Sequence, residues 1–311
     1  MISKRTASLR HIPAGPALVL LPILLVTLGC STILPGSSRA PSADLPTDAV
    51  HVQARDALAR WADAVTKSGG ATISFVGDLT GQLGEWEPAV GENNKQALAA
   101  GLLTAPTPLS GTAPSRNHVR WLDGKTIDVD VLSAKDALDD LVAAAGSSSC
   151  AECRPMRVTD ANLATGLVET SQGPAEAPLW VFTVEGTDVR VTRNAVDPSV
   201  TVVPPPFNAD HPPEGVSIDQ ATGTPGARKL TVSFSGAEKN GDQPCGADYT
   251  AEAVESSLAV VVIVIEHRNT TEATCRLVAK TRTAVVTLAD PLGERAVLEV
   301  TQGLPVPIRA P

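Results

Sequence analysis

Apolar residues recur along the chain at two spacings, which predict its helices and strands. Over residues 48–67 they recur every three or four positions behind an N-cap at Thr47, the pattern of an amphipathic helix. Trp61 lies in that stripe and is expected to anchor a core. A second helical stripe covers residues 134–145, with Ser133 as its N-cap.

Alternating and β-branched runs predict strands in the same part of the chain. Asp123-Gly124 separates two such runs, as in a two-residue hairpin turn. A second hairpin is expected where the strand 71–76 meets the glycine-rich stretch 77–86. Val- and Thr-rich segments, with Gly173-Pro174 and Pro178 between them, predict an antiparallel meander. Its segments are residues 156–167, 168–171, 179–185 and 188–196.

These elements predict an α+β domain over residues 48–197. Six prolines follow within residues 198–213, and such a run can neither lie centrally in a sheet nor form a helix. We therefore expect residues 198–213 to be a semi-rigid linker between two domains.

Short runs with turn signals between them predict an all-β, sandwich-like domain over residues 214–302, followed by a tail at 303–311. Six consecutive β-formers, residues 260–265, predict a strand that is buried on both faces or central in its sheet. A helix over residues 251–258 is an open alternative. The expected strands are 217–219, 229–234, 259–267, 279–288 and 296–301.

The N-terminus has the layout of a secretory signal. Lys4, Arg5 and Arg10 precede an uncharged run over residues 17–28. That run would rise about 18 Å as a helix, well short of the ~30 Å core of a bilayer. It is therefore expected to direct export rather than to span the membrane permanently.

The end of the signal, Thr27-Leu28-Gly29-Cys30, resembles the bacterial lipobox, in which the Cys takes a thioether-linked diacylglycerol before cleavage on its amino side. We expect residues 1–29 to be a lipoprotein signal peptide and Cys30 to be lipid-attached, since two or more acyl chains hold a protein stably at a membrane. Residues 30–47 are rich in Ser, Pro and Ala and predict a flexible tether. An ordinary cleaved signal with a stray thiol is the alternative.

Composition narrows the class of protein. Hydrophobic residues make up 43% and charged residues 19% of the 311, which is typical of a globular chain. Aromatic residues make up 3%, whereas Gly and Pro number 24 and 25, which favours strands and turns over helical bundles. The net charge of -9 argues against nucleic acid or an anionic lipid surface as a partner of the folded part.

The chain contains five cysteines, and assigning Cys30 to lipid leaves four that can pair evenly. Their spacings suggest Cys150 with Cys153 and Cys245 with Cys275, although four cysteines allow three connectivities. Paired cysteines are typical of an oxidising compartment. In the loop-entropy model the longer bridge contributes roughly 3.5–4 kcal/mol to stability and the shorter one roughly 2 kcal/mol or less.

Cys150 and Cys153 also allow a functional interpretation. A C-x-x-C pair can be a redox site when its first Cys begins a helix, or part of a metal site when a second ligand pair is present. Pro155 discourages a helix here, and neither Cys245 nor Cys275 lies in a metal-ligand pair. We expect a structural bridge, and an extracytoplasmic thiol–disulfide protein using Cys150 and Cys153 is the alternative function.

One polar, glycine-rich stretch has an aromatic residue at its centre. Trp86 in a loop could stack on a sugar or peptide, with Asn93 and Asn94 supplying hydrogen bonds. The interpretation that we favour is a hairpin loop whose Trp86 closes the core.

Sequence motifs for catalysis are missing: the five histidines form no metal-ligand pattern, and no nucleotide-binding or nucleophile-elbow motif is present. No cofactor, metal or catalytic residue is therefore expected. Asp123, Asp128 and Asp130 are expected to form a solvated acidic face rather than a calcium site. An envelope hydrolase built from scattered Ser, His and Asp is a further alternative.

Two stretches resemble parts of secreted lipoproteins of high-G+C Gram-positive bacteria: residues 180–186, and residues 282–288 together with 290–295. The resemblance is to families without an assigned activity, so it implies a location and a fold type but no catalytic residue. The sequence thus predicts a lipid-anchored protein on the outer face of the cytoplasmic membrane, without enzymatic activity. Its expected role is binding or envelope support, with the membrane as a partner through Cys30 and an envelope protein or glycan as a possible ligand.

Overall fold

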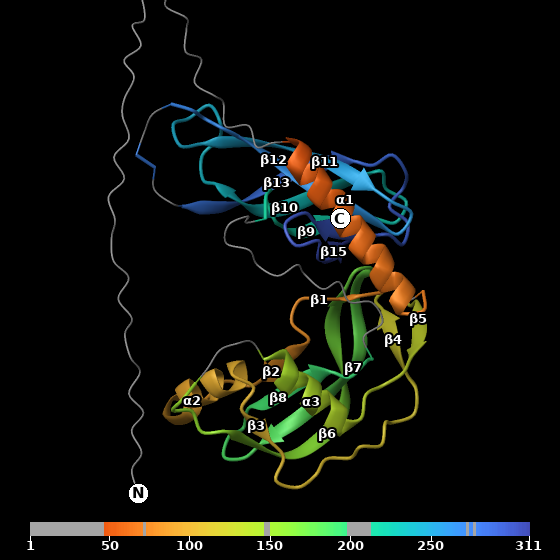
Figure 1. Cartoon of the computed structure of the whole chain (residues 1–311), viewed down its shortest axis with the longest axis vertical. Helices are drawn as coiled ribbons and strands as arrows, with labels where there is room; N and C mark the ends of the chain where they lie inside the picture. Colours follow the sequence, from red (N-terminus) through yellow and green to blue (C-terminus); the bar gives the residue numbers. More distant parts are fainter. Residues whose placement is uncertain (1–46, 71–72, 146–149, 198–212, 272–273, 276–277) are drawn as a thin grey trace, which may run out of the picture. The chain divides into compact units, whose positions relative to one another are not determined.

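The computed structural model describes residues 47–70, 73–145, 150–197, 213–271, 274–275 and 278–311. Within them the chain is largely β-sheet, with three helices and fifteen strands (Figure 1). The parts of the chain outside the described residues include four that sequence analysis singles out. These are the expected signal peptide at 1–29, the lipid-attachment residue Cys30, residues 30–46 of the expected tether and residues 198–212 of the expected linker.

Helices α1 (Thr47–Lys67) and α3 (Ala134–Ala144) confirm the two helices that the sequence predicts. Ser133 Oγ accepts a hydrogen bond from the backbone N–H of Asp136 at 3.1 Å, so the expected N-cap of α3 is formed. Helix α2 (Pro88–Ala99) was not expected. Its polar sequence has no clear apolar stripe, and a Pro in the first turn is equally compatible with a loop.

One sheet holds the strands between residues 75 and 194. β7 is central: it pairs with β6 along its whole length on one side, and with β4 and then β8 on the other. β5 pairs with β4, β2 with β8, and both β1 and β3 pair with β6. The strands are β1 (Phe75–Val76), β2 (Thr80–Leu83), β3 (Leu103–Thr104), β4 (Asn117–Trp121), β5 (Thr126–Val129), β6 (Met156–Thr170), β7 (Gly173–Val184) and β8 (Arg190–Asn194).

The two expected hairpins have different outcomes. The Asp123-Gly124 hairpin is confirmed: β4 and β5 pair antiparallel, and Gly124 has a φ of +90°, a left-handed conformation that favours glycine. The hairpin expected between residues 71–76 and 77–86 is wrong, because β1 pairs with β6 and β2 with β8. An isolated hairpin of such short strands is marginally stable, whereas the edges of a larger sheet offer many more contacts.

The meander is formed. The chain turns at residues 171–172, directly before the expected break at Gly173-Pro174, but the break expected at Pro178 is wrong. β6 runs unbroken for 15 residues, and β7 continues through Pro174 and Pro178 for 12 residues. The carbonyl of Pro178 accepts a hydrogen bond from Ala195, on the side away from β6. The N–H and C=O of one residue in an antiparallel strand point to the same side, so the missing N–H of Pro178 removes no bond to β6.

Burial alternates along β7. Trp180, Phe182 and Val184 are buried, whereas the residues between them are half-buried. The buried set forms a core with Leu138 and Leu141 of α3. Ala175 and Ala177 lie on the opposite face and are buried in a second core with Val119 and Trp121 of β4. The fully buried face of β7 therefore changes between its first and second halves.

The strands after residue 217 form two sheets packed face to face. One sheet has the order β13-β10-β9-β15 and the other the order β11-β12-β14. Val232 and Phe234 of the first meet Val260 and Val262 of the second in a common core, which makes this a β-sandwich. The strands are β9 (Ile218–Thr222), β10 (Lys229–Ala237), β11 (Ala247–Glu255), β12 (Ala259–Arg268), β13 (Ala279–Thr287), β14 (Ala296–Glu299) and β15 (Ile308–Arg309).

Strand β12 is buried on both faces and central in its sheet, as the sequence predicts. Its second face carries Val261 and Ile263, which pack with Trp61 of α1 (orange in Figure 1). Gln53 of α1 also donates to the carbonyl of Val300 at 2.7 Å. Trp61 is therefore a core residue, as expected. Its core, however, is that of the sandwich sheet and not that of the strands between residues 75 and 194, because a strand that is apolar on both faces needs a second cover.

Two further details of the sandwich differ from expectation. The helical alternative for residues 251–258 is wrong, because β11 pairs residue by residue with β12 from Ala247 to Glu255. The tail at 303–311 contains β15, which pairs parallel with β9. Ala247, Tyr249, Ala251 and Ala253 of β11 alternate with polar residues, but alanine is a poor strand former, and β15 has only two residues. The conformation of both segments therefore depends on the neighbouring strands.

Candidate functional site

Both expected disulfides are formed: Cys150 pairs with Cys153 and Cys245 with Cys275, with Cα–Cα distances of 5.4 and 5.5 Å. The structure thus selects one of the three connectivities that the sequence left open. The two bridges mark two candidate sites, one beside α2 and one at an end of the sandwich.

At the first site, α2 holds the loop that carries the short bridge. Asn93 Oδ1 accepts the backbone N–H of Arg154 at 2.8 Å, and Asn93 Nδ2 donates to the carbonyl of Arg154 at 3.2 Å. Gln96 Oε1 lies 3.3 Å from Cys150 Sγ and 3.7 Å from Cys153 Sγ. The structure therefore brings together Asn93 and the C-x-x-C pair, which sequence analysis treated separately.

The surroundings of the short bridge are rich in acceptors. Gln96 turns its oxygen to the sulfurs because its amide nitrogen donates to Glu92 Oε1 at 2.5 Å. A turn follows Cys150, and the next element is the strand β6 rather than a helix. A C-x-x-C thiolate is stabilised by cations or a helix N-terminus, so these neighbours suit a closed bridge better than a reactive thiolate.

The loop interpretation of Trp86, Asn93 and Asn94 needs correction, because residues 88–99 form a helix. Trp86 is only 8% exposed, and its indole N–H donates to Gln82 Oε1 at 2.7 Å. Asn94 is also buried and accepts from Asn93. A buried indole offers no open face on which a sugar could stack. Trp86 packs into the core, as in the interpretation that we favour.

The second site is a cleft of about 770 Å³ beside the long bridge. Small residues make up much of its wall, together with the disulfide. Three polar side chains of β9, β11 and β12 reach it: Asp219, Tyr249 and Glu266, followed along β12 by Arg268. Among the described residues that line this cleft, Arg268 is the only cation.

A chain of hydrogen bonds connects these side chains. Tyr249 Oη accepts the backbone N–H of Ala237 at 2.7 Å and donates to Glu266 Oε1 at 2.9 Å. Arg268 Nε donates to Glu266 Oε2 at 2.6 Å. Burial raises the pKa of Tyr249, and the hydrogen bond to Glu266 raises the pKa of Arg268. Tyr249 therefore stays a neutral donor that holds Glu266, which in turn orients Arg268.

Asp219 reaches the cleft through an irregularity of β9. Gln220 pairs with Ser233 and Ile218 with Phe234, so Asp219 is an extra residue without a partner in β10. A bulge of this kind changes the direction of a side chain and is common beside functional sites. Sequence analysis missed Asp219, Tyr249, Glu266 and Arg268. The only local signal was that Glu266 and Arg268, two apart on a strand, share a face.

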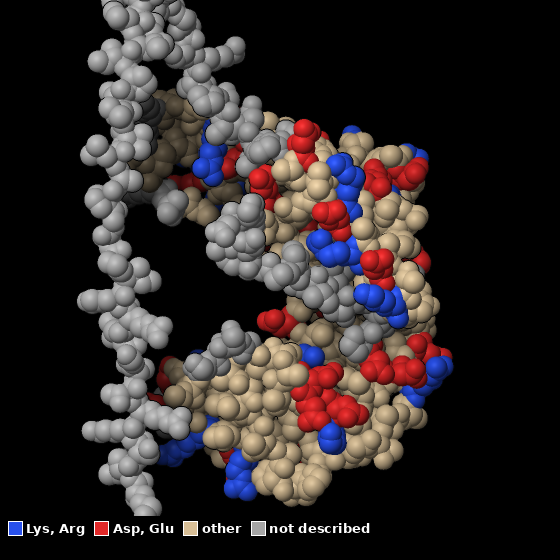
Figure 2. Space-filling view, viewed as in Figure 1, with Lys and Arg blue, Asp and Glu red and all other residues tan. Residues whose placement is uncertain are grey.

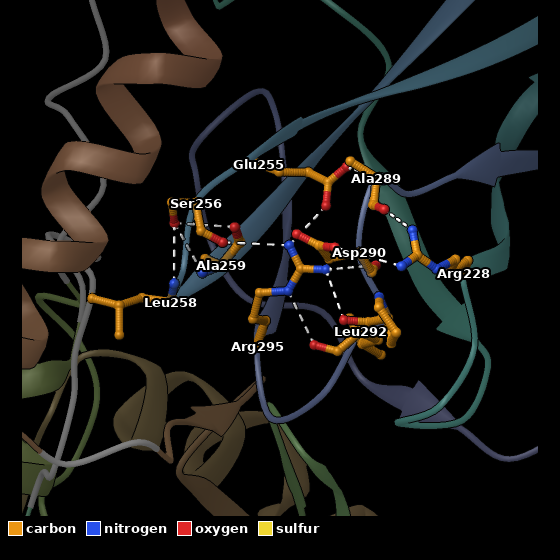
Figure 3. Close-up of polar contacts among 10 residues, drawn as sticks. Arg228, Glu255, Ser256, Leu258, Ala259, Ala289, Asp290, Leu292 and Arg295 are labelled. Atoms are coloured by element: carbon orange, nitrogen blue, oxygen red, sulfur yellow. Dashed lines mark hydrogen bonds and ion pairs between the residues drawn. The ribbon is translucent and has the colours of Figure 1, made fainter.

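A third cluster joins the loop before β14 to the end of β11 (Figure 3). Arg295 donates to Glu255 Oε2 at 2.7 Å, and the two side chains are only 11% and 19% exposed. Arg295 also donates to the carbonyls of residues 290–292. Burial acts to raise the pKa of Glu255, but hydrogen bonds from Ala289 and Arg295 lower it. All these bonds hold the loop, so the cluster serves structure.

Acidic and basic side chains are interspersed on the face drawn in Figure 2. None of the helices in the described part of the chain combines the length and the apolar character needed to cross a bilayer. Within the same residues, no three His, Cys, Asp or Glu side chains converge as metal ligands would. Comparison of the chain with protein-family models, curated proteins and solved structures found no match.

Proposed function

We propose that this protein is a lipid-anchored extracytoplasmic protein whose folded part is a non-enzymatic binding module. The observation that carries the proposal is the pairing of the four described cysteines with one another. None of them is left to bond Cys30, the remaining cysteine of the chain, which ends the lipobox-like segment. Disulfides persist in oxidising compartments, so the pairing also supports export.

We also propose that the folded part consists of two domains. α2, α3 and the strands β1–β8 form the first, and the sandwich forms the second, close to the boundaries at 48–197 and 214–302. Separate hydrophobic cores support this division, with α1 assigned to the sandwich. Limited proteolysis of the full chain should cut between residues 198 and 212 and leave two resistant fragments that stay associated, because α1 belongs to the N-terminal fragment and packs on the sandwich. A first cut inside β6 or β12 would contradict the division.

Acylation of Cys30 tests the anchor directly. The full-length gene is expressed in a bacterium that makes lipoproteins, in medium with an alkyne-labelled fatty acid, and the product is extracted from membranes. Label is expected on the wild type and on Ser31→Ala, a neighbouring control, but not on Cys30→Ala. Intact mass should show a chain that begins at Cys30 and carries at least two acyl groups.

Two results would overturn the anchor: an unlabelled wild-type chain in the soluble fraction, or equal labelling of Cys30→Ala. Neither result depends on the fold, because residue 30 precedes every element that the structure describes.

A thiol–disulfide protein using Cys150 and Cys153 is the second candidate. It is favoured by one observation, the position of Gln96 Oε1 within reach of both sulfurs, where it could accept an S–H after reduction. Incubation with a dithiol reporter tests it. Turnover that is lost in Cys150→Ser, and kept in Cys245→Ser, would favour this candidate, and no turnover in the wild type would end it.

A further inference from the structure

We propose that the cleft beside the Cys245–Cys275 bridge binds a small zwitterion, such as an unblocked short peptide, with Arg268 taking its carboxylate and Asp219 its ammonium group. The proposal specifies the ligand class for the binding role above and rests on that role. Lipid attachment plays no part in it.

Arg268 is held in place yet has unused donors. Its Nε is bonded to Glu266, which Tyr249 holds in turn. None of the hydrogen bonds within the described residues uses its two terminal nitrogens, and 77% of its side chain is exposed. A guanidinium whose direction is already set loses less freedom when its fork receives a carboxylate.

Asp219 is the second unused charge. It is exposed at the bulge of β9, and no ion pair or side-chain hydrogen bond within the described residues engages it. Arg268 and Glu266 pair through Nε, and Arg282 lies beside the cleft over the Tyr249 ring, with its terminal nitrogens bonded to Asn240 and to the carbonyl of Ala247. A ligand with one charge of each sign complements Asp219 and the unused terminal nitrogens of Arg268, whereas a phosphate or a simple anion would leave Asp219 unpaired.

The cleft has space for a short ligand body. Its volume of about 770 Å³ falls within the range of small-molecule sites. Gly236, Gly246 and Ala247 line the cleft with little or no side chain, and Val278 is 48% exposed at its border. A Cβ on Gly236 would lie 2.7 Å from the Tyr249 hydroxyl, so this position must be small for Tyr249 to reach Glu266. The disulfide closes one side with a covalent link.

Three probes of equal backbone separate the contributions of the two charges: Ala-Ala with free ends, N-acetyl-Ala-Ala, and Ala-Ala amide. Binding to the full chain in detergent is measured by saturation-transfer NMR on the probe. Because both charged groups are exposed, a dissociation constant on the order of 1 mM is expected for free Ala-Ala. Each blocked probe should bind about fivefold more weakly.

Variants assign each contribution to a residue. In Arg268→Gln the free peptide and the amide should bind alike, and in Asp219→Asn the free and acetylated peptides should bind alike. Lys229→Gln and Asp242→Asn are matched controls, each removing one charge outside the lining of the cleft, and they should keep the wild-type order. Circular dichroism confirms that each variant folds.

The comparison of the three probes on the wild type needs no variant, so a misfolded Arg268→Gln would not leave the proposal open. Three results would overturn the proposal. They are equal binding of all three probes, no binding of free Ala-Ala at a concentration 10-fold above the expected dissociation constant, and tighter binding of inorganic phosphate than of free Ala-Ala. Acylation of Cys30 is read separately by the fatty-acid label. If the probes do not bind as expected and Cys30 is labelled, the ligand class is refuted, whereas the proposed lipid anchor stands.

Discussion

The central strands of the two sheet systems, β7 and β12, are covered in different ways. Burial alternates along β7: in its second half one face packs against elements that include α3, and in its first half the opposite face packs in a second core with β4. The first six residues of β12 are all buried, with the sandwich core on one face and α1 on the other. α1, at Thr47–Lys67, is far from β12, at Ala259–Arg268, in the sequence. The apolar pattern of a strand thus predicts how many of its faces are buried, but not which element packs against each face.

The largest expected effect comes from removing the distant cover of β12. Trp61→Ala should lower the free energy of unfolding by about 3–5 kcal/mol, because it leaves a cavity where Trp61 packs against Val261 and Ile263. Urea unfolding measures the loss. Val52→Ala, on the exposed side of the same helix, is the control and should change stability by less than about 0.5 kcal/mol. Equal effects of the two variants would show that α1 does not cover β12.

Removal of the Cys245–Cys275 bridge is a second test of the stability of the sandwich. The double variant Cys245→Ser with Cys275→Ser opens a loop with a sequence separation of 30 and should cost roughly 3.5–4 kcal/mol. Thermal unfolding with and without reductant measures it. In the double variant the addition of reductant should cause little further change, and a large further change would place the stabilisation elsewhere.

The pH dependence of the free energy of unfolding tests the Glu255–Arg295 pair of the sandwich. The pKa of Glu255 is lowered in the folded state, so its stabilising contribution is present above the pKa of the unfolded chain and is lost as pH falls towards the folded value. Glu255→Gln should cost about 1.5–3 kcal/mol at pH 7 and flatten this part of the acid dependence. Urea unfolding from pH 7 to pH 3 measures both. Stability that falls equally steeply in the variant would contradict the assignment.

The short bridge is expected to have the smallest effect. The double variant Cys150→Ser with Cys153→Ser opens a loop with a sequence separation of 3 and should cost roughly 2 kcal/mol or less. Asn93 still holds Arg154 at two points, which limits the local disorder. Hydrogen exchange should therefore change around residues 150–155 and not in the sandwich. A loss as large as that of the long bridge would make this loop a part of the core.

The same reasoning explains which elements sequence analysis missed. Helix α2 has a polar sequence whose helical state depends on its contact with the Cys150 loop and the core under Trp86. β11 is rich in alanine, a poor strand former, and β15 has only two residues, so both take their conformation from the strands they pair with, β12 and β9. Pro178 predicts a break in β7 as long as the direction of its missing N–H relative to β6 is unknown, and only the pairing of the strands gives that direction.

By itself the sequence determined the local features of this protein: helices α1 and α3 with the Ser133 cap, the Asp123-Gly124 turn, the two-sided burial of β12 and the even set of cysteines. These follow from periodicity, capping and turn chemistry, which act over a few residues. Only the tertiary structure decided that α1 covers β12 and that Asp219 and Arg268, on different sheets, border one cleft. Such contacts depend on sheet packing, strand register and a bulge, and a shift of one residue in any strand would turn its side chains to the other face.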